Sequence, residues 1–205
     1  LSHLKLSDGV AGFLLANGAL NDSDTLEIRK KLIQKDKVES IIVLPRELFI
    51  TTDISVTLWI LNQNKKGGNY HNRKLRNREH EFLFMDLRQW TENPVRGESK
   101  KKVQLVTKQI EKASDIYHTW QCDGTDGKNY EIPELYRSVS IEEIERKGWT
   151  LTPSKYIEFV DHDLDINYEK EMARIQSEMK EIMEQEKKSQ LMLKDAFREI
   201  GYGID

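Results

Sequence analysis

Long apolar runs, paired cysteines and an excess of positive charge are all missing from this chain of 205 residues. No apolar stretch approaches the roughly 18 residues of a membrane helix and no secretory leader opens the sequence, so we expect a soluble protein. The single cysteine, Cys122, excludes an internal disulfide and fits a reducing cytoplasm, where we expect the protein to reside. A formal net charge of −3 argues against a chain that coats nucleic acid by bulk electrostatics, although it leaves room for a local basic patch.

Charged residues are concentrated at one end of the chain. The charged fraction is 33%, above the usual value of roughly a quarter, and the hydrophobic fraction is only 38%. From residue 161 onward Glu, Lys, Gln and Met dominate, so residues 1–160 have an ordinary balance and can bury a core. Because domains centre on about 100 to 150 residues, we expect one domain with an appendage.

Residues 9–61 alternate short apolar runs with one charged segment, as successive elements of an α/β sheet do. The runs GFLLA and SIIVLP are almost continuously apolar, which predicts strands at 10–16 and 39–44 that are covered on both faces. The charged segment between them predicts a helix at about 24–35. In ISVTLWIL, residues 54–61, apolar residues alternate with mixed ones, which predicts a strand with one apolar face.

Three further elements are predicted downstream. HEFLFMDL indicates a strand at residues 80–87. A helix is expected at about 101–120, with a packed face spaced by threes and fours. Ser140 and Glu143 form a capping-box pattern for a short helix that ends at Gly148. The expected packed face of the longer helix consists of Val103, Val106, Ile110, Ala113 and Tyr117.

The order of these motifs resembles the modification (methyltransferase) subunit of type I restriction-modification systems. The resembling pieces run from GVAGFLLANGAL through EIRKKLI, IIVLPRELF and TLWIL to FLFMDLRQW, IYHTW and SVSIEEIERKGWTLTPSKYI, and so cover nearly the whole chain. The resemblance implies an adenine-N6 DNA methyltransferase that uses S-adenosylmethionine. It also implies an α/β fold in which a Rossmann-like methyltransferase sheet contains an antiparallel strand at residues 54–61.

Two motifs of that family are missing from the sequence. The family binds its cofactor on a glycine-rich loop and holds the target adenine with an Asn-Pro-Pro-aromatic motif, and both precede the GFLLANG strand. Here the only Asn-Pro, Asn93-Pro94, is followed by Val95. We therefore expect the C-terminal part of a longer subunit, with an incomplete sheet, no bound cofactor and no activity alone. The expected parts are the second half of the catalytic domain at 1–98, a helical extension at 99–160 and a long C-terminal helix at 161–205.

Two segments are candidates for DNA contact. In the resembling enzymes an aromatic ring that stacks on the flipped base lies just after the sixth strand, and VLPRELF puts Phe49 there. Packing of Phe49 into the core is the alternative. The loop 62–78 is basic and has Gly67-Gly68 at an expected flexible point, so it could follow a phosphate backbone or be a solvated connection. Its cations are Lys65, Lys66, Arg73, Lys74, Arg76 and Arg78.

The segment 163–200 carries the seam of a coiled coil. Apolar residues recur at spacings of four and three, and no Gly or Pro interrupts them. A helix of this length is too long to bury itself on so small a body, so we expect its stripe to dock on the long helices of a specificity subunit. The alternatives are a hairpin folded at KKSQ and a homodimer in isolation. The stripe consists of Tyr168, Met172, Ile175, Met179 and Ile182.

The sequence supports no metal or nucleophile site. His118 and Cys122 are four apart, but zinc needs about four ligands and no companion motif exists. Two functions therefore compete. The first is a fragment of a type I modification subunit, whose partners are DNA and the specificity and restriction subunits, with no membrane involved. The second is a non-enzymatic α/β interaction module with a coiled-coil arm.

Overall fold

The computed structural model describes residues 3–49, 53–70, 72–90, 103–160, 168–199 and 201–202. The chain divides into two compact units, Leu1–Val160 and Asp161–Asp205. Among the described residues, no helix combines the length and the apolar character that a membrane span requires.

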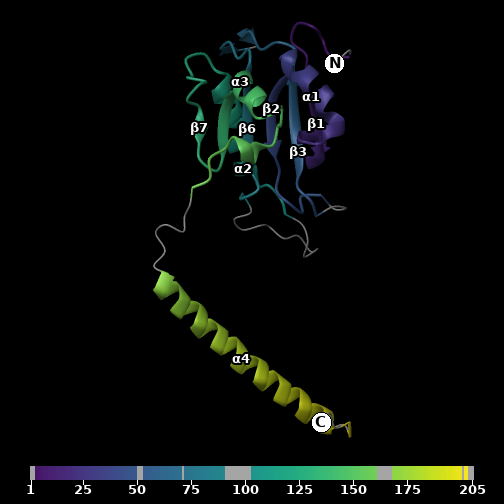
Figure 1. The fold of residues 1–205 in the computed structure, drawn as a ribbon, viewed down its shortest axis with the longest axis vertical. Coiled ribbons are helices and arrows are strands. Elements are labelled where there is room, and N and C mark those ends of the chain that lie inside the picture. The colour runs from purple at the N-terminus through teal and green to yellow at the C-terminus, as the bar shows by residue number, and fades with distance from the viewer. Residues whose placement is uncertain are drawn as a thin grey trace. The chain divides into compact units, whose positions relative to one another are not determined.

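The first unit is built on a mixed six-stranded sheet in the order β1-β3-β2-β6-β8-β7 (Figure 1). Strand β3 lies between β1 and β2 and is antiparallel to both, which confirms the antiparallel strand expected at this place. Strand β2 pairs with β6 in parallel, and β8 is antiparallel to its neighbours β6 and β7. The strands are β1 (Val10–Ala16), β2 (Val38–Val43), β3 (Val56–Asn62), β6 (Glu81–Asp86), β7 (Glu131–Ile132) and β8 (Tyr136–Ser140).

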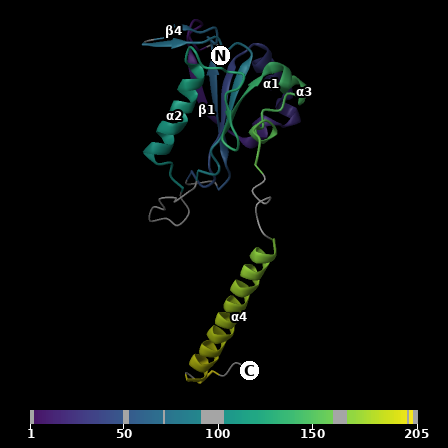
Figure 2. The same cartoon turned by 90° about the vertical axis from the view of Figure 1, so that its left-hand side faces the viewer.

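Helices cover both faces of this sheet (Figure 2). Helices α1 (Leu26–Gln34) and α3 (Ile141–Arg146) pack on one face, where Ile33 and Ile144 are fully buried in the larger core. Helix α2 (Thr107–Gln121) packs on the other face through Ile116 and Trp120. Three short 3-10 turns, Asn17–Leu20, Ser23–Thr25 and Pro153–Lys155, complete the connections.

The two strands that looked alike in sequence differ in burial. Every residue of β2 is buried, as expected for a strand covered on both faces. Strand β1 is the edge strand of the described sheet, and its side chains alternate between half-buried and exposed. Val10 is 48% exposed and Leu14 is 46% exposed. The prediction that β1 is covered on both faces is therefore wrong for this chain, because only the α1 face of β1 is packed.

Helix α2 also departs from its prediction. It begins at Thr107, and the side chain of Gln109 accepts a hydrogen bond from the Val106 amide just before it (3.0 Å). The expected packed face is confirmed in part. Ala113 and Tyr117 pack against the buried core and Val103 is buried, whereas Val106 and Ile110 are exposed. The prediction missed Ile116, Trp120 and Gln121, which are the buried residues of the helix. The reason is tertiary: the large Trp120 side chain fills the space over β6, with its indole N–H donating to Ser138 Oγ (3.0 Å).

The segment expected to be a helical extension contributes two strands, β7 and β8, to the sheet itself. Helix α3 forms as expected and is followed by Gly148 in the left-handed region (φ 71°). The predicted capping box is wrong, because the Ser140 side chain makes no capping hydrogen bond. Glu143 instead pairs with Arg137 and Lys147, each at 2.9 Å.

The second unit is one continuous helix, α4 (Tyr168–Glu199), of 32 residues. It passes without a break through residues 187–190, so the hairpin alternative is wrong. None of its described residues is buried. Residues 161–167 and 200, which belonged to the predicted segment, lie outside the described residues.

Candidate functional site: two ends of the sheet and the exposed stripe of α4

The segment between β3 and β6 contains a small hairpin, β4 (Gly68–Tyr70) paired with β5 (Arg73–Leu75). Gly67 has φ 87°, and a Cβ built on it would lie 2.6 Å from the carbonyl oxygens of Leu75 and Arg76. Only glycine fits so close an approach at a positive φ. The Gly67-Gly68 pair, expected to be a flexible point, therefore includes a tightly packed turn.

Glu39 is the centre of a buried polar network at this end of the sheet. It lies in β2 at a bulge, where the register against β3 shifts between Val38 and Ser40, and it is fully buried. A bulge re-aims a side chain, which explains how an acidic residue in an apolar strand reaches a polar partner. The partner is the fully buried Arg78, whose Nε lies 2.9 Å from Glu39 Oε1.

Three more side chains complete the hydrogen bonding of Glu39. Tyr117 donates its hydroxyl to Oε2 (2.7 Å), Asn62 donates its amide to Oε2 (2.8 Å), and Gln121 donates its amide to Oε1 (3.2 Å). Burial, reinforced by the charge of Glu39, raises the pKa of Tyr117, so its hydroxyl stays protonated and acts as a donor. The network thus ties β2, β3 and α2 to the segment that precedes β6.

Two other cations of this segment are buried in ion pairs. Lys65 Nζ lies 2.5 Å from Asp36 and also donates to the carbonyls of Val38 (3.0 Å) and Glu81 (2.7 Å). Burial lowers the pKa of Lys65, and the negative charge of Asp36 opposes this effect. Arg76 pairs with Glu81 at 2.7 Å and lies over the Trp120 ring.

These contacts correct the expectation that all six cations line a DNA-binding loop. Lys65, Arg76 and Arg78 have their charges buried and neutralised inside the protein, so they are not available to a phosphate in this structure. Lys66 and Lys74 are exposed, and Lys74 pairs with Asp123 at 2.6 Å. The sequence held one clue to this outcome: Glu39 interrupts an otherwise apolar strand, and a buried carboxylate requires a buried cation.

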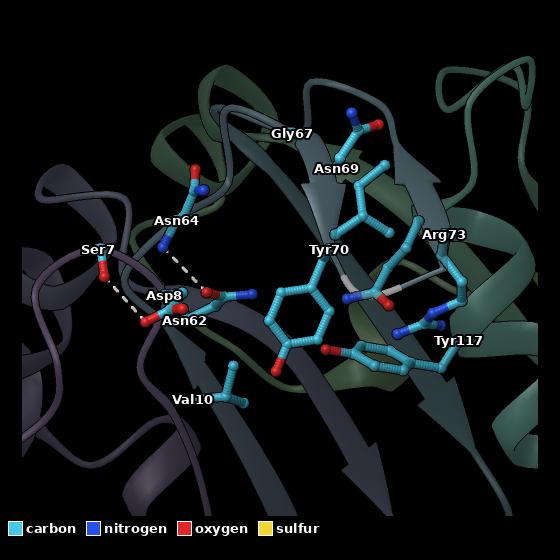
Figure 3. Close-up of a pocket in the computed structure, with 12 residues that line it drawn as sticks. Ser7, Asp8, Val10, Asn62, Asn64, Gly67, Asn69, Tyr70, Arg73 and Tyr117 are labelled. Carbon is cyan, nitrogen blue, oxygen red and sulfur yellow. Dashed lines mark hydrogen bonds between the residues drawn. The ribbon is translucent and has the colours of Figure 1, made fainter.

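A cavity of about 420 Å³ lies beside this network (Figure 3). Tyr70, Arg73 and Tyr117 lie on one side of it, and Ser7, Asp8 and Asn62 lie on the other. Two buried atoms that belong to its lining, Arg73 Nη1 and Gln121 Oε1, have no hydrogen-bond partner among the described residues. The remaining lining residues are Val10, Asn64, Gly67, Asn69, Leu75 and Gln121.

Phe49 lies at the opposite end of the sheet. It follows β2 in a loop at the carboxyl ends of β2 and β6, whereas the segment 62–80 precedes β6 at their amino ends. Phe49 is half-buried, and the amide of Val103 donates to the carbonyl of the neighbouring Glu47 (3.1 Å). A six-residue strand spans about 20 Å, so the structure does not bring Phe49 and the basic segment together. Base stacking by Phe49 stays a prediction.

The described part of the chain contains no cluster of metal-ligating side chains. His118 lies within hydrogen-bond distance of Ser114 Oγ (3.4 Å), and burial together with the charge of Arg73 lowers the pKa of His118. Cys122 makes a β-bridge to Leu75.

The stripe on α4 is exposed along its whole length. Met172 is 37% exposed, Ile175 44% and Ile182 65%, with Tyr168 and Met179 also exposed. On the same helix Arg174 forms ion pairs with Glu171 and Glu178. Exposed pairs of this kind support an isolated helix only weakly, so burial of the stripe would be the main source of its stability.

The mixed sheet with helices on both faces defines an α/β protein. The model of the N-6 DNA methylase family matches residues 1–164, and the chain belongs to this family. Over 201 residues it is 30% identical to the HindI methylase subunit, which belongs to a type I restriction enzyme of Haemophilus influenzae. The match covers 95% of this chain and 41% of that subunit. It is 28% identical to the MjaIX methylase subunit of Methanocaldococcus jannaschii, over 95% of this chain and 33% of that one.

A solved structure is similar as well. The type I restriction-modification methyltransferase subunit of Streptococcus thermophilus matches with a TM-score of 0.56 and 26% identity, over 77% of this chain and 28% of that one. The chain thus spans less than half the length of the curated relatives it matches, between 24% and 41%.

Replacing Glu39 tests the importance of the buried network. Glu39→Gln keeps the size of the side chain and leaves the Arg78 guanidinium buried without a counter-charge. Removal of one partner of such a pair costs about 3 to 5 kcal/mol, so we expect the free energy of unfolding of the first unit to fall by about this amount. Urea denaturation followed by tryptophan fluorescence measures it.

The control is Glu27→Gln, which removes an exposed carboxylate 3.5 Å from Lys30. An exposed ion pair contributes at most about 1 kcal/mol. Equal losses for the two variants would show that the Glu39 network does not hold this end of the sheet together.

Proposed function

We propose that this chain is the C-terminal part of the modification subunit of a type I restriction-modification enzyme. The intact subunit transfers a methyl group from S-adenosylmethionine to adenine N6 in DNA and works in the cytoplasm. The observation that carries the proposal is the match to the N-6 DNA methylase family over residues 1–164, together with relatives that cover 95% of this chain and are methylase subunits. The same match favours this proposal over a non-enzymatic interaction module.

The edge strand supports the idea that the sheet is incomplete here. The outer edge of β1 has no strand paired to it among the described residues, and apolar edges of this kind are normally protected in native proteins. In the intact subunit, further strands of a Rossmann-like sheet continue from this edge. The glycine-rich cofactor loop and the Asn-Pro-Pro-aromatic motif belong to that missing part.

Two surfaces of this chain serve the proposed function. Phe49, at the carboxyl ends of the parallel strands, stacks on the extruded adenine, because ligands of open α/β sheets bind at that end. At the other end, phosphate contact is proposed only for the exposed cations Lys66 and Lys74, and not for Arg73, whose Nη1 is buried in the lining of the cavity. The basic segment therefore contacts DNA away from the target base.

The exposed stripe of α4 is the proposed docking surface for the specificity subunit, and the restriction subunit joins the same assembly. A helix with an apolar seam from Tyr168 to Ile182 and no buried residue gains stability by packing in a helical bundle. In isolation the same stripe would pair two copies of this chain. The specificity subunit then competes with that homodimer.

The first test is cofactor binding. Calorimetry with S-adenosylmethionine should show no micromolar binding to the 205-residue chain, because both motifs that hold cofactor and base lie outside it. The intact subunit serves as the positive control. Micromolar binding by the chain alone would mean that the cofactor site has been misplaced.

The second test concerns Phe49. Loss of one base-stacking ring costs about 1 to 3 kcal/mol, so Phe49→Ala in the intact subunit should lower methylation roughly 5- to 150-fold while the melting temperature stays unchanged. Phe159→Ala, which removes an exposed ring outside this loop, is the matched control. Unchanged methylation rates in Phe49→Ala would remove Phe49 from the base pocket.

The third test concerns α4. Glutamate at Ile175, Met179 and Ile182 should abolish co-purification of the intact subunit with its specificity subunit, because three charges cannot be buried in a helical bundle. Glutamate at Ser177, Lys180 and Lys187, on the other side of the helix, should leave the complex intact. Circular dichroism confirms that both triple variants stay folded. A complex that survives the first set places the docking surface elsewhere.

A further inference from the structure

The loop that carries Phe49 contains a residue in an unusual backbone conformation. Glu47, two positions before Phe49, is the second residue of a turn at 46–47 and has φ 59°. Turns with a positive φ at this place usually have Gly or Asn there, because most other residues are sterically disfavoured in the left-handed region. A glutamate adopts this conformation only where contacts around it hold the turn in place.

The contact that holds the turn is made by the backbone of Glu47. Its carboxylate has no hydrogen-bond or ion-pair partner among the described residues, whereas its carbonyl accepts a hydrogen bond from the Val103 amide (3.1 Å). Val103 is only 9% exposed, so this hydrogen bond is shielded from water. The turn before Phe49 is therefore supported by the segment that precedes α2.

That segment is itself fixed to the end of β6. Gln109, in the first turn of α2, accepts a hydrogen bond from the Val106 amide through Oε1 (3.0 Å). Its Nε2 donates to the carbonyl of Trp90 (2.6 Å), and Trp90 packs against the core on the α2 side of the sheet. A series of contacts thus runs from the residues that follow β6, through Gln109 and Val103, to the carbonyl of Glu47.

The two residues after Glu47 have different surroundings. Leu48 packs against the same core, whereas Phe49 is half-buried and belongs to neither core cluster of the described residues. This difference fits an extended chain, in which neighbouring side chains point to opposite sides. Because the backbone of residue 47 sets the path of the chain that follows it, the direction of the Phe49 ring depends on the left-handed conformation of Glu47.

We propose that Glu47 and Val103 are positioning residues for the loop that holds the target base. Glu47 acts through its left-handed backbone and Val103 acts through its amide, and together they set the direction of the Phe49 ring. The carboxylate of Glu47 takes no part. This inference rests on the proposed function, in which Phe49 stacks on the extruded adenine, and it adds what aims the ring.

Substitutions at position 47 separate the backbone from the side chain. In the intact subunit, Glu47→Gly and Glu47→Asn accept a positive φ, so kcat for methylation should stay within about twofold of its original value. Glu47→Val introduces a β-branched residue that disfavours this conformation. Its kcat should fall at least about tenfold, because a misplacement of about 1 Å can cost about 100-fold. The affinity for S-adenosylmethionine should not change in any of the three variants.

Glu134→Val is the matched control, because it makes the same substitution at a residue with φ 62° outside this loop. It should leave kcat unchanged. Equal losses of kcat in Glu47→Gly, Glu47→Asn and Glu47→Val would assign the effect to the carboxylate and overturn the inference. A kcat for Glu47→Val that stays at the original value, or an equal loss in Glu134→Val, would overturn it as well.

The role of the Val103 amide is tested separately. Val103→Pro removes the N–H that donates to Glu47, whereas Val103→Ala keeps it and shortens the buried side chain. We expect kcat to fall in Val103→Pro and to stay close to its original value in Val103→Ala. Equal values of kcat in these two variants would show that the hydrogen bond does not position the loop.

A double-mutant cycle tests whether Glu47 acts through Phe49. In a Phe49→Ala background, Glu47→Val should cause no further loss of kcat, because the ring that it misdirects is already gone. Additive losses would overturn the inference. Unchanged methylation in Phe49→Ala alone would refute the proposed role of Phe49. A low kcat in Phe49→Ala beside an unchanged kcat in Glu47→Val would refute only the positioning role.

Hydrogen exchange of the intact subunit gives a readout that does not depend on methylation. Exchange in the peptide that contains the Val103 amide should become at least about tenfold faster in Glu47→Val, because the hydrogen bond to residue 47 is lost. In Glu47→Gly it should keep its original rate. Equal exchange in these two variants would overturn the inference, whatever the role of Phe49.

Discussion

The buried pair of Glu39 and Arg78 is the constraint on which this end of the structure depends. Burying both charges is tolerated because each oxygen of Glu39 accepts two hydrogen bonds, from Arg78 and Gln121 on one side and from Tyr117 and Asn62 on the other. These donors come from β3, from α2 and from the segment before β6. A single carboxylate therefore fixes how three parts of the chain meet.

The pair is also one of three ion pairs that neutralise cations of the basic segment inside the protein. Lys65, Arg76 and Arg78 each have an acidic partner inside the protein, and together they hold the start of β6 against β2. Chemistry on a base is proposed for the opposite end of the sheet, where Phe49 lies. The buried ion pairs thus lie at the amino ends of β2 and β6, and Phe49 lies at the carboxyl ends of the same strands.

The two units differ in how far their apolar residues are buried. In the first unit, helices on both faces bury the central strands, while one face of β1 and the edge strand β7 are exposed among the described residues. In the second, none of the described residues of α4 is buried, and its apolar stripe is exposed. The chain belongs to the N-6 DNA methylase family and spans between 24% and 41% of the curated relatives it matches.

The amino-acid sequence by itself determined the elements with a strong local pattern. The strands within residues 10–62 and the long α4 were predictable, because the spacing of apolar residues along the chain is a local property. The antiparallel orientation of β3 was predictable from the order of the motifs that resemble the methyltransferase family. The Asn-Pro-Pro-aromatic motif was likewise recognisably absent.

Only the tertiary structure decided which residues of those elements are buried. Strand β1 looked like β2 in sequence, yet it is half-exposed because it has a neighbour on one side only. On α2 the spacing predicted the packing of Ala113 and Tyr117 but missed Ile116 and Trp120, which lie in the buried cluster with residues of β6. The partners of Lys65, Arg76 and Arg78 lie 5 to 39 positions away in the chain, so local pattern showed their charge but not its burial. Burial and pairing are properties of contacts between distant segments, and those contacts exist only once the chain has folded.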